Sequence, residues 1–517
     1  MKKLLTLLLI LLLPAVALGE VGVTVTDETI NTVNPLLFGD NLSWRGDGYG
    51  LWDAASDTLD ASLIDAFARS GITHLRYPGG IEASYFHWQE TIGTQRIPQI
   101  DPFSMDWPTE AGEQGARYHP GFGFDEFIAF CEQTGIAPSV VLNVGSGTPW
   151  EAADWILYCL ARGIPVAAWD VGNEEHFWHN QVPGMNIAKT EEEYIAFYRE
   201  LYAILQAELT PEQLDGLSLG AIGLPASHPL CVRKAWDRTI LQALGGQMDY
   251  LDVHIGYATY NVDGADNDSI AKALMASAEW VHQMLEDVKR EIDRYAGEEG
   301  EHIAIHISEH GPMTASFHYN TVAGALFQAD LFNMLLREPK VTAANHLPAI
   351  NHYAAANVVG TADFPVVEKN RGRVFWKNAV SYVFDLYAPL AGQEVLKTSV
   401  KAGTFDSPRV GLVRAMNDVP LADAAAYRDA DGALTLMLLN RDTAQAQDFA
   451  VALPAAFALN HCQRLYSKNC FAYNSWNRDS VCLAVLDASE ASMDGQTLML
   501  PCPPMSLTVM QLAPQEK

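Results

Sequence analysis

The hydrophobic pattern along the chain predicts two architectures in succession. Between residues 34 and 385, short apolar runs of strand length alternate with amphipathic segments of helical length, such as residues 63–71 and 191–209. Repeated strand and helix alternation gives parallel strands, so this region predicts an α/β fold, a (β/α)8 TIM barrel. The eight expected strands are residues 35–44, 73–79, 136–145, 164–174, 217–224, 249–257, 302–311 and 343–351.

The C-terminal part of the chain, residues 386–517, follows a different pattern. Short alternating runs such as residues 433–441 and 506–513 are separated by turn-rich stretches, which is typical of an antiparallel β-sandwich. Residues 21–26 alternate in the manner of an edge strand, and we expect the N-terminal segment 20–33 to join this sandwich. The predicted domains are therefore a catalytic barrel at 34–385 and a C-terminal β-sandwich at 386–517.

The first 19 residues have the pattern of a secretory signal peptide. Two lysines precede an apolar stretch, and small residues follow at Ala15, Ala17 and Gly19. A single membrane anchor is the alternative, but the apolar stretch is shorter than the roughly 20 residues that span a bilayer. We therefore expect a secreted or periplasmic protein that begins near Glu20, with no membrane association after cleavage.

The strong negative charge limits the range of partners. The chain has 33 Lys and Arg against 63 Asp and Glu, a formal net charge of −30. Such a surface repels polyphosphate, so nucleic acid is not an expected partner, and strongly anionic polysaccharides are disfavoured for the same reason. A neutral oligo- or polysaccharide is compatible with this charge, and the oligomeric state is left open.

The cysteine pattern predicts disulfides and no metal. Seven cysteines are an odd number, so at least one thiol is unpaired within the chain. In an exported protein we expect one or two disulfides among the four C-terminal cysteines, with the pairing open. These are Cys462, Cys470, Cys482 and Cys502. No Cys/His grouping has zinc-ligand spacing, so no metal and no other cofactor is expected.

Two glutamates carry the expected chemistry. Glu174 in WDVGNE and Glu309 in ISEHGP each stand at the downstream end of a predicted barrel strand, where barrel enzymes present reacting groups. A retaining glycosidase needs an acid/base and a carboxylate nucleophile about 5 to 5.5 Å apart. We expect Glu174 to be the acid/base and Glu309 the nucleophile. The alternatives are solvated surface charges and, for the acid/base, the adjacent Glu175.

Four further polar residues at strand ends are expected to support these glutamates. Asn173 precedes Glu174 and could bind a sugar hydroxyl, while Arg76 is a cation that could hold the nucleophile ionised. His254 and Tyr257 end the sixth strand, and the Tyr257 hydroxyl could donate to Glu309. A structural ion pair for Arg76, and core packing for His254 and Tyr257, are the alternatives.

Three tryptophans follow strand ends and are candidates for stacking on sugar rings: Trp44, Trp88 and Trp178. Packing of the indole rings within the loops is the alternative for each.

Five segments of the chain resemble family 51 of the glycoside hydrolases, the α-L-arabinofuranosidase family, and occur in the same order. They are LRYPGGIEASYFHWQETIG, WDVGNE, DVHIGY, ISEHGP and AANHLPAINHY. The resemblance spans about residues 34–390 and implies a retaining barrel enzyme with glutamates after strands 4 and 7. It implies Glu174 as acid/base, Asn173 as its sugar-binding neighbour, Glu309 as nucleophile, Arg76 as its supporting cation and Tyr257 as the tyrosine beside it.

Three positions depart from the family's pattern. This chain has Ser43 where arabinose-binding members have Glu in the first strand's exit loop, Ile81 where they have Asn after the paired glycines, and Pro348 where they have Gln in the eighth strand. These residues would hold the terminal sugar. The departures leave the chemistry intact and the substrate open.

The resemblance favours an α-L-arabinofuranosidase that acts on plant cell-wall polysaccharide by double displacement. An endo-β-1,4-glucanase or related endo-glycanase on the same scaffold is an alternative, because the sugar contacts are altered. A non-catalytic carbohydrate-binding protein is a second alternative, disfavoured because both carboxylates are present.

Overall fold

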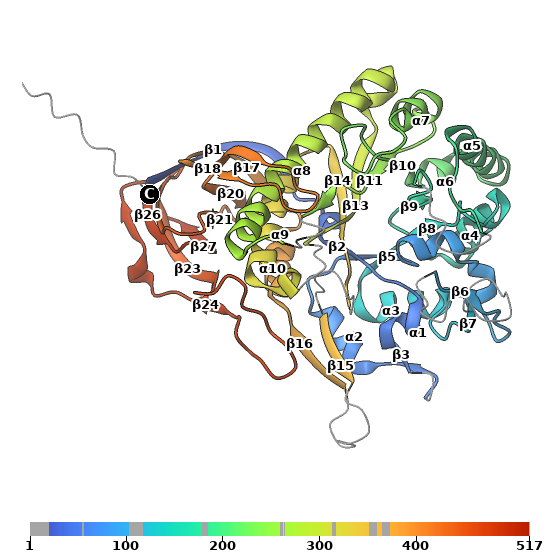
Figure 1. The fold of residues 1–517 in the computed structure, drawn as a ribbon, viewed down its shortest axis with the longest axis horizontal. Coiled ribbons are helices and arrows are strands. Elements are labelled where there is room, and N and C mark those ends of the chain that lie inside the picture. Colours follow the sequence, from blue (N-terminus) through green and yellow to red (C-terminus); the bar gives the residue numbers. More distant parts are fainter. Residues whose placement is uncertain are drawn as a thin grey trace, which may run out of the picture.

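The computed structural model describes residues 20–53, 56–102, 117–177, 185–258, 262, 264–312, 317–350, 359–363 and 373–515. A barrel surrounded by helices occupies one side of the molecule and a large, mostly antiparallel sheet the other, with helices α9 and α10 between them (Figure 1). Within these residues no helix combines the length and the apolar character that a bilayer crossing requires.

Eight parallel strands close into the predicted barrel. They follow chain order around it, and the pairing of β11 with β13 completes the ring, while β12 (Gly256–Tyr257) extends the pairing along β13. The eight are β2 (Gly39–Asn41), β5 (His74–Tyr77), β8 (Ala137–Leu142), β9 (Trp169–Val171), β10 (Leu219–Gly223), β11 (Tyr250–Val253), β13 (Ala304–Gly311) and β14 (Val341–His346). Each lies within or overlaps one of the eight predicted strands, and the prediction of a TIM barrel is confirmed.

Helices with clear capping signals surround the barrel. Thr148 caps the start of α4 with its side chain and the left-handed Gly163 ends it, while Thr190 and Glu193 form a capping box at α5. The helices are α2 (Ala61–Ala68), α3 (Phe124–Thr134), α4 (Pro149–Arg162), α5 (Glu191–Glu208), α6 (Pro211–Asp215), α7 (Trp236–Leu244), α8 (Asn267–Tyr295), α9 (Val322–Leu336) and α10 (Ala379–Tyr387).

Several short elements lie outside the barrel strands and the helices around them. The turn labelled α1 (Arg45–Gly50) is left-handed, because Gly46 to Tyr49 have φ between 54° and 67°. The two-stranded ladders are β3 (Trp52–Asp53) with β4 (Thr58–Leu59), β6 (Gln99–Ile100) with β7 (Arg117–Tyr118), β15 (Val359–Asp363) with β16 (Arg373–Lys377), and β18 (Thr404–Ser407) with β19 (Met416–Pro420). The 3-10 helices are η1 (Pro35–Phe38), η2 (Ile81–Tyr85), η3 (Trp88–Thr91), η4 (Gly297–Glu301), η5 (Phe317–Asn320), η7 (Ala388–Leu390) and η8 (Ala488–Glu490).

The second sheet contains the predicted C-terminal strands and the first strand of the described chain. Its order is β24 (Leu483–Val485), β23 (Phe457–Tyr466), β27 (Ser506–Pro514), β21 (Leu434–Asn440), β20 (Ala422–Arg428), β17 (Glu394–Lys401), β1 (Glu20–Thr32), β22 (Gln447–Ala452), β26 (Thr497–Cys502) and β25 (Ser492–Asp494). In Figure 1 the blue β1 lies along the orange β17. The prediction of an edge strand is wrong, because β1 pairs antiparallel with β17 and parallel with β22.

Both faces of this sheet are covered, which explains its period-two pattern. In β21, Leu434, Leu436 and Leu438 belong to a core within the C-terminal unit, while Met437 and Leu439 pack toward the barrel helices. The prediction of a C-terminal antiparallel sheet domain is confirmed. We propose 34–385 and 386–517 as the two domains, with 20–33 joining the second, and the pairings of β1 support that division.

Helix α9 and its C-cap residue Arg337 fasten the sheet to the barrel through two ion pairs, of which the first is buried. Both oxygens of Asp330 accept from Arg441 at 2.6 and 2.7 Å, and Arg337 donates to both oxygens of Asp423 at 3.0 and 3.1 Å. Asn333, between them on the helix, also donates to Asp423. Because the Asp330 side chain has no exposed surface and that of Arg441 is 7% exposed, these two charges depend on each other for compensation.

The disulfide prediction is wrong. Cys462 and Cys502 are buried, Cys470 is partly buried, Cys482 is exposed, and all four are free thiols, as are the other three cysteines. Cys462 and Cys502 therefore act as small apolar side chains in the core of the C-terminal unit.

Candidate active site

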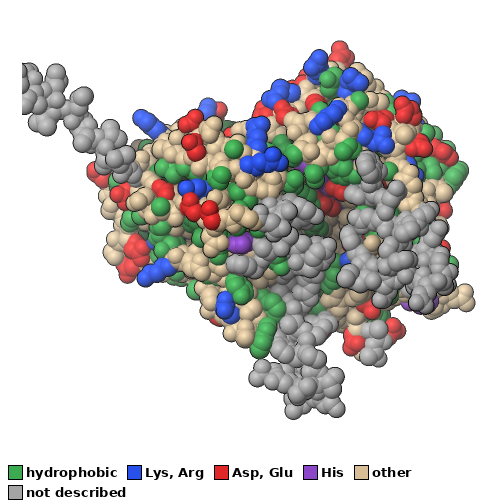
Figure 2. Space-filling view, in the orientation of Figure 1, with side chains coloured by type: hydrophobic (Ala, Val, Ile, Leu, Met, Phe, Trp, Pro, Cys, Tyr) green, Lys and Arg blue, Asp and Glu red, His purple; other side chains and the backbone are tan. Residues whose placement is uncertain are grey.

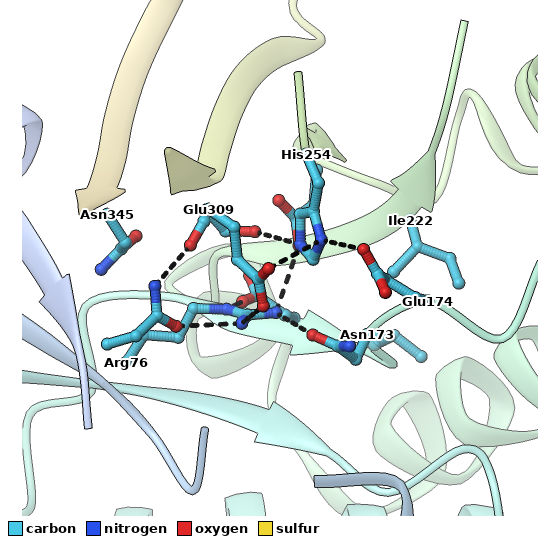
Figure 3. Close-up of polar contacts among 12 residues, drawn as sticks. Arg76, Asn173, Glu174, Ile222, His254, Glu309 and Asn345 are labelled. Atoms are coloured by element: carbon cyan, nitrogen blue, oxygen red, sulfur yellow. Dashed lines mark hydrogen bonds and ion pairs between the residues drawn. The ribbon is translucent and has the colours of Figure 1, made fainter. Parts of the chain in front are cut away.

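Glu174 and Glu309 converge at the carboxyl end of the barrel strands. Glu309 lies on β13, Glu174 follows β9, and one carboxylate oxygen of each lies within 4.8 Å of the other. His254, which follows β11, bridges them, because its Nδ1 is 2.8 Å from Glu174 Oε1 and 3.4 Å from Glu309 Oε2 (Figure 3). The Glu174 side chain is 20% exposed and that of Glu309 8%, so the acid faces more solvent than the expected nucleophile.

Arg76, on β5, contacts Glu309, the expected nucleophile. Its Nη1 is 3.6 Å from Glu309 Oε1, and its Nε donates to Asp170 at 2.5 Å. Burial disfavours a charged guanidinium, but Asp170, Asp252 and Glu309 outweigh it and raise the pKa of Arg76. Arg76 is therefore a permanent cation in the floor of the site, and the geometry includes both the structural ion pair and the expected contact with Glu309.

Tyr257 and Asn173 also lie where the sequence places them. The Tyr257 hydroxyl donates to Glu309 Oε2, and Arg76 Nη2 donates to Asn173 Oδ1 at 3.1 Å. Because the oxygen of Asn173 is used in this way, its amide nitrogen is the group left for a ligand.

Glu175 points away from the site. Its carboxylate accepts from the Ser84 hydroxyl at 2.8 Å and from the Asn173 backbone N–H at 2.8 Å, and the residue is 1% exposed. Gly172, with φ 97°, permits this fold-back, because a β carbon there would lie 2.4 Å from Glu175 Oε2. Burial raises the pKa of Glu175. Glu175 braces the loops after β9 and β5, so of the two adjacent glutamates only Glu174 faces Glu309 and His254.

Two of the three tryptophans are core residues. Trp88 stacks on Trp155 with ring centroids 5.5 Å apart and donates to the Glu151 carbonyl, and Trp44 packs against Phe86. The exposed fractions of Trp88 and Trp44 are 3% and 1%, so neither ring offers a face to a sugar and their prediction as stacking residues is wrong. Trp178 lies outside the described residues.

Among the residues that the structure describes, two groups of side chains have spacing that a metal ion could use. The ligand atoms of Glu174, His254 and Glu309 lie within 4.8 Å of one another, and so do those of His282, Glu286 and Glu338. In the second group Lys289 already donates to both carboxylates, at 2.7 and 2.9 Å. In the first, His254 and Arg76 supply positive charge to the carboxylates, and the geometry is explained without an ion.

Similar proteins come from several bacteria. The chain is 23% identical to "Exo-alpha-(1->6)-L-arabinofuranosidase" of Bifidobacterium longum, over 94% of this chain and 96% of that protein. It is 23% identical to "Intracellular exo-alpha-L-arabinofuranosidase" of Bacteroides ovatus, over 90% and 89%. The fold matches a GH51 arabinofuranosidase structure from Xanthomonas axonopodis pv. citri with a TM-score of 0.78 and 19% identity, covering 96% of this chain and 100% of that one.

Two family models match the chain directly. The alpha-L-arabinofuranosidase 1 domain matches residues 66–162 and the alpha-L-arabinofuranosidase C-terminal domain residues 300–506, together more than half of the chain. The chain belongs to the α-L-arabinofuranosidase family. This membership confirms the resemblance to family 51 and the prediction of a glycoside hydrolase.

The comparison with similar proteins contradicts the prediction that this protein is secreted or periplasmic. The Bacteroides ovatus relative, which matches 90% of this chain, is named an intracellular enzyme. Residues 1–19, on which the prediction of a signal peptide rested, lie outside the described residues.

The three departures from the pattern of the arabinofuranosidase family all lie near the site and are buried. Ile81 packs with Tyr85, Ile100 and Ile187 in a small apolar cluster, so its side chain is committed to packing. Ser43 is 6% exposed, and Pro348 follows β14. None of the three reproduces the polar side chain that the family pattern has at its position.

Three residues of the site were missed by sequence reasoning. Asp170 and Asp252 pair with Arg76 inside the barrel. The side-chain oxygen of Asn41 accepts a hydrogen bond from Arg76 Nη1 at 3.1 Å. A signal was present, because charged residues within apolar strands must be paired to be buried. Asp170 and Asp252 stand in such strands and could have been matched to Arg76.

His254 is expected to titrate on the basic side of neutrality. Burial disfavours its imidazolium, but Glu309 and Glu174, together with Asp252, outweigh burial and raise the pKa of His254 from 6.5 to about 9. The folded protein therefore holds this proton more tightly than the unfolded chain. The resulting stabilisation is complete below about pH 6.5 and is lost as the pH rises through about 9. NMR of protein labelled at histidine Cε1 measures the midpoint directly.

The control for this titration is His228. Burial lowers the pKa of His228 to about 4, so the two signals move at opposite ends of the pH range, and a His254→Gln variant assigns the first of them. A His254 midpoint near 6.5 would mean that the two glutamates do not hold its proton.

Proposed function

We propose that this protein is a retaining α-L-arabinofuranosidase in which Glu309 is the nucleophile and Glu174 the acid/base. The observation that carries the proposal is the approach of the two carboxylates to within 4.8 Å across one site. Retaining glycosidases place their carboxyl groups about 5 to 5.5 Å apart, whereas inverting enzymes leave about 6.5 to 9.5 Å for a water molecule. The separation supports double displacement.

In the first step Glu309 attacks the anomeric carbon while Glu174 gives its proton to the departing glycosidic oxygen. The bond from carbon to that oxygen breaks as an ester between Glu309 and the sugar forms. Arg76 and Tyr257 hold the two oxygens of Glu309 in place for this attack. In the second step Glu174 takes a proton from water, the water oxygen attacks the same carbon, and Glu309 leaves with the configuration retained.

His254 keeps a proton next to the acid. Its Nδ1 is 2.8 Å from Glu174 Oε1 and its Nε2 is 2.9 Å from the Ser308 hydroxyl, so the ring is fixed at both nitrogens. Glu174 exchanges its proton twice in each catalytic cycle. Because water returns that proton in the second step, the role of His254 is to hold the Glu174 carboxyl in position for both transfers.

The sugar is inferred from the family. The relatives from Bifidobacterium longum and Bacteroides ovatus are named exo-acting α-L-arabinofuranosidases, which supports a terminal α-L-arabinofuranosyl group on a hemicellulose chain as the substrate. The acidic net charge of −30 favours neutral glycans over anionic ones.

An assay with two substrates tests the proposal. We expect release of the aryl group from an aryl α-L-arabinofuranoside and no cleavage of a soluble β-1,4-glucan. NMR during the first turnovers should show the α-anomer of the sugar as the initial product. Cleavage of the polymer alone would indicate an endo-glycanase, binding of glycans without cleavage of either substrate would indicate a carbohydrate-binding protein, and an initial β-anomer would exclude double displacement.

A further inference from the structure

A third carboxylate, that of Glu82, lies beside the nucleophile and has no part in the two-step chemistry. Glu82 is the second residue of η2, the 3-10 helix that begins directly after Gly79 and Gly80, and it is only 7% exposed. A β carbon placed on Gly80 would lie 2.7 Å from Glu309 Oε1 and 3.8 Å from Glu82 Oε2. The two carboxylates therefore border the same small space above the paired glycines.

Glu82 is held by hydrogen bonds and by the electrostatic attraction of Arg45, without a direct ion pair among the described residues. Its carboxylate accepts from the Ser43 hydroxyl and from a backbone N–H. The positive charge of Arg45 lowers the pKa of Glu82, while Arg45 Nε itself pairs with Asp101 Oδ1 at 2.7 Å. Across the part of the chain that the structure describes, no Lys, Arg or His nitrogen lies within 4.0 Å of Glu82. Burial raises the pKa of Glu82, and the charge of Glu309 adds to that effect.

A purely structural role does not account for a carboxylate at this position. The bond to Ser43 joins the loop after β2 to the loop after β5, but a glutamine would make the same connection without burying a charge next to Glu309. Burying a charge beside another of the same sign is unfavourable in the free protein. Hydrogen-bond donors from a ligand would relieve that penalty, so the arrangement is better explained by a bound molecule rich in hydroxyl groups.

We propose that Glu82 accepts hydrogen bonds from ring hydroxyls of the terminal sugar and so selects that sugar at the nucleophile. The inference rests on the proposed function, because it requires the sugar's anomeric carbon at Glu309. Of the first two residues of η2, Ile81 is packed in the apolar cluster with Tyr85 and Ile100, which leaves Glu82 to face the sugar.

The location of Glu82 also suits the transition state. Positive charge develops at the sugar ring as the glycosidic bond breaks, and hydrogen bonds to ring hydroxyls strengthen at that point. A second carboxylate near Glu309 increases the acceptor strength on this side of the ring. Glu82 would therefore affect kcat as well as KM, and the size of both effects would depend on one hydroxyl group of the substrate. A residue that only shapes the loop would affect all substrates equally.

The assignment of Glu82 to a sugar hydroxyl is tested by combining a change in the protein with a change in the substrate. The wild type and Glu82→Gln are compared on an aryl α-L-arabinofuranoside and on its 2-deoxy, 3-deoxy and 5-deoxy analogues. On the parent substrate the variant is expected to lose about 10- to 100-fold in kcat/KM, the loss of a hydrogen bond to a charged group. On the analogue that lacks the bound hydroxyl, the two proteins should differ by much less. Equal losses for every substrate would overturn the inference.

Two further variants separate recognition from structure. Asp101→Asn removes the partner of Arg45 in the same polar cluster and should change kcat/KM for all four substrates by one common factor. If Glu82→Gln does not fold, Ser43→Ala is used in its place; it frees the Glu82 carboxylate and should reduce discrimination between the parent and the same deoxy analogue. A wild type that cleaves no arabinofuranoside would refute the proposed function. If the wild type cleaves it and Glu82→Gln lowers kcat/KM by the same factor on every substrate, only the role of Glu82 is refuted.

Discussion

Replacing Glu309 with Gln is expected to lower kcat by a factor on the order of 10⁴ to 10⁶, the range seen when a nucleophile is removed from an enzyme. An amide does not form the ester with the sugar, so the first displacement stops. The amide oxygen can still accept from Tyr257, and the residue keeps its shape, so the fold and the binding of sugar should persist. Steady-state rates on an aryl α-L-arabinofuranoside and calorimetric binding of L-arabinose measure the two effects separately.

The matched control is Glu175→Gln. Glu175 is also a buried glutamate at the mouth of the barrel, but it faces Ser84 and the Asn173 backbone instead of the substrate space. It should lower kcat far less than the change at Glu309. In a Glu309→Ala variant, added azide should restore turnover and yield a glycosyl azide of inverted configuration, because azide enters from the face that the carboxylate vacated. Unaltered turnover in Glu309→Gln would rule out this nucleophile.

The largest expected effect on stability comes from Arg441. Its guanidinium donates to both oxygens of Asp330, whose side chain has no exposed surface. Arg441→Leu leaves that carboxylate buried without its cation, which costs about 3 to 5 kcal/mol in the free energy of unfolding. The change should appear in urea titrations as a lower midpoint, with the contact between α9 and the C-terminal sheet opening first.

Two variants control for this effect. The double replacement of Arg441 and Asp330 with Leu should recover most of the loss, because the orphaned charge is then absent. Arg290→Ala breaks an exposed pair with Asp287 on α8 and should cost at most about 1 kcal/mol. A loss in Arg441→Leu no larger than that of the exposed pair would mean that the buried bridge does not fasten the two units together.

The barrel was accessible from the sequence because its strands are buried on both faces. Such strands read as continuous apolar runs between amphipathic helices, and each of the eight runs contains or overlaps a barrel strand. The two proposed catalytic glutamates were found for a related reason, since a carboxylate at the downstream end of an apolar run must emerge at the mouth of the barrel. The expected roles of Arg76 and Tyr257 came from their places at strand ends and from the resemblance, and the contacts of both with Glu309 agree with them.

What the sequence could not supply is the direction of each side chain within a loop. Trp44 and Trp88 follow strand ends, as cleft residues do, yet both rings turn into the core. Glu82 stands beside Ile81, and neither periodicity nor spacing indicates which of the two packs and which faces Glu309. The alternation of β1 shows two differently covered faces, but it carries no information on whether a strand has one neighbour or two.

The place of β1 between β17 and β22 has a consequence for biosynthesis. Residues 20–32 leave the ribosome before both of their partners, which lie at 394–401 and 447–452. At about 5 to 20 residues per second, tens of seconds pass before the slot for β1 exists. During that time Val21, Val23 and Val25 have no core to enter, which makes this segment a natural target for chaperones. A fragment that starts at residue 386 would carry a gap in the middle of its sheet, and adding residues 20–33 as a separate peptide should fill it.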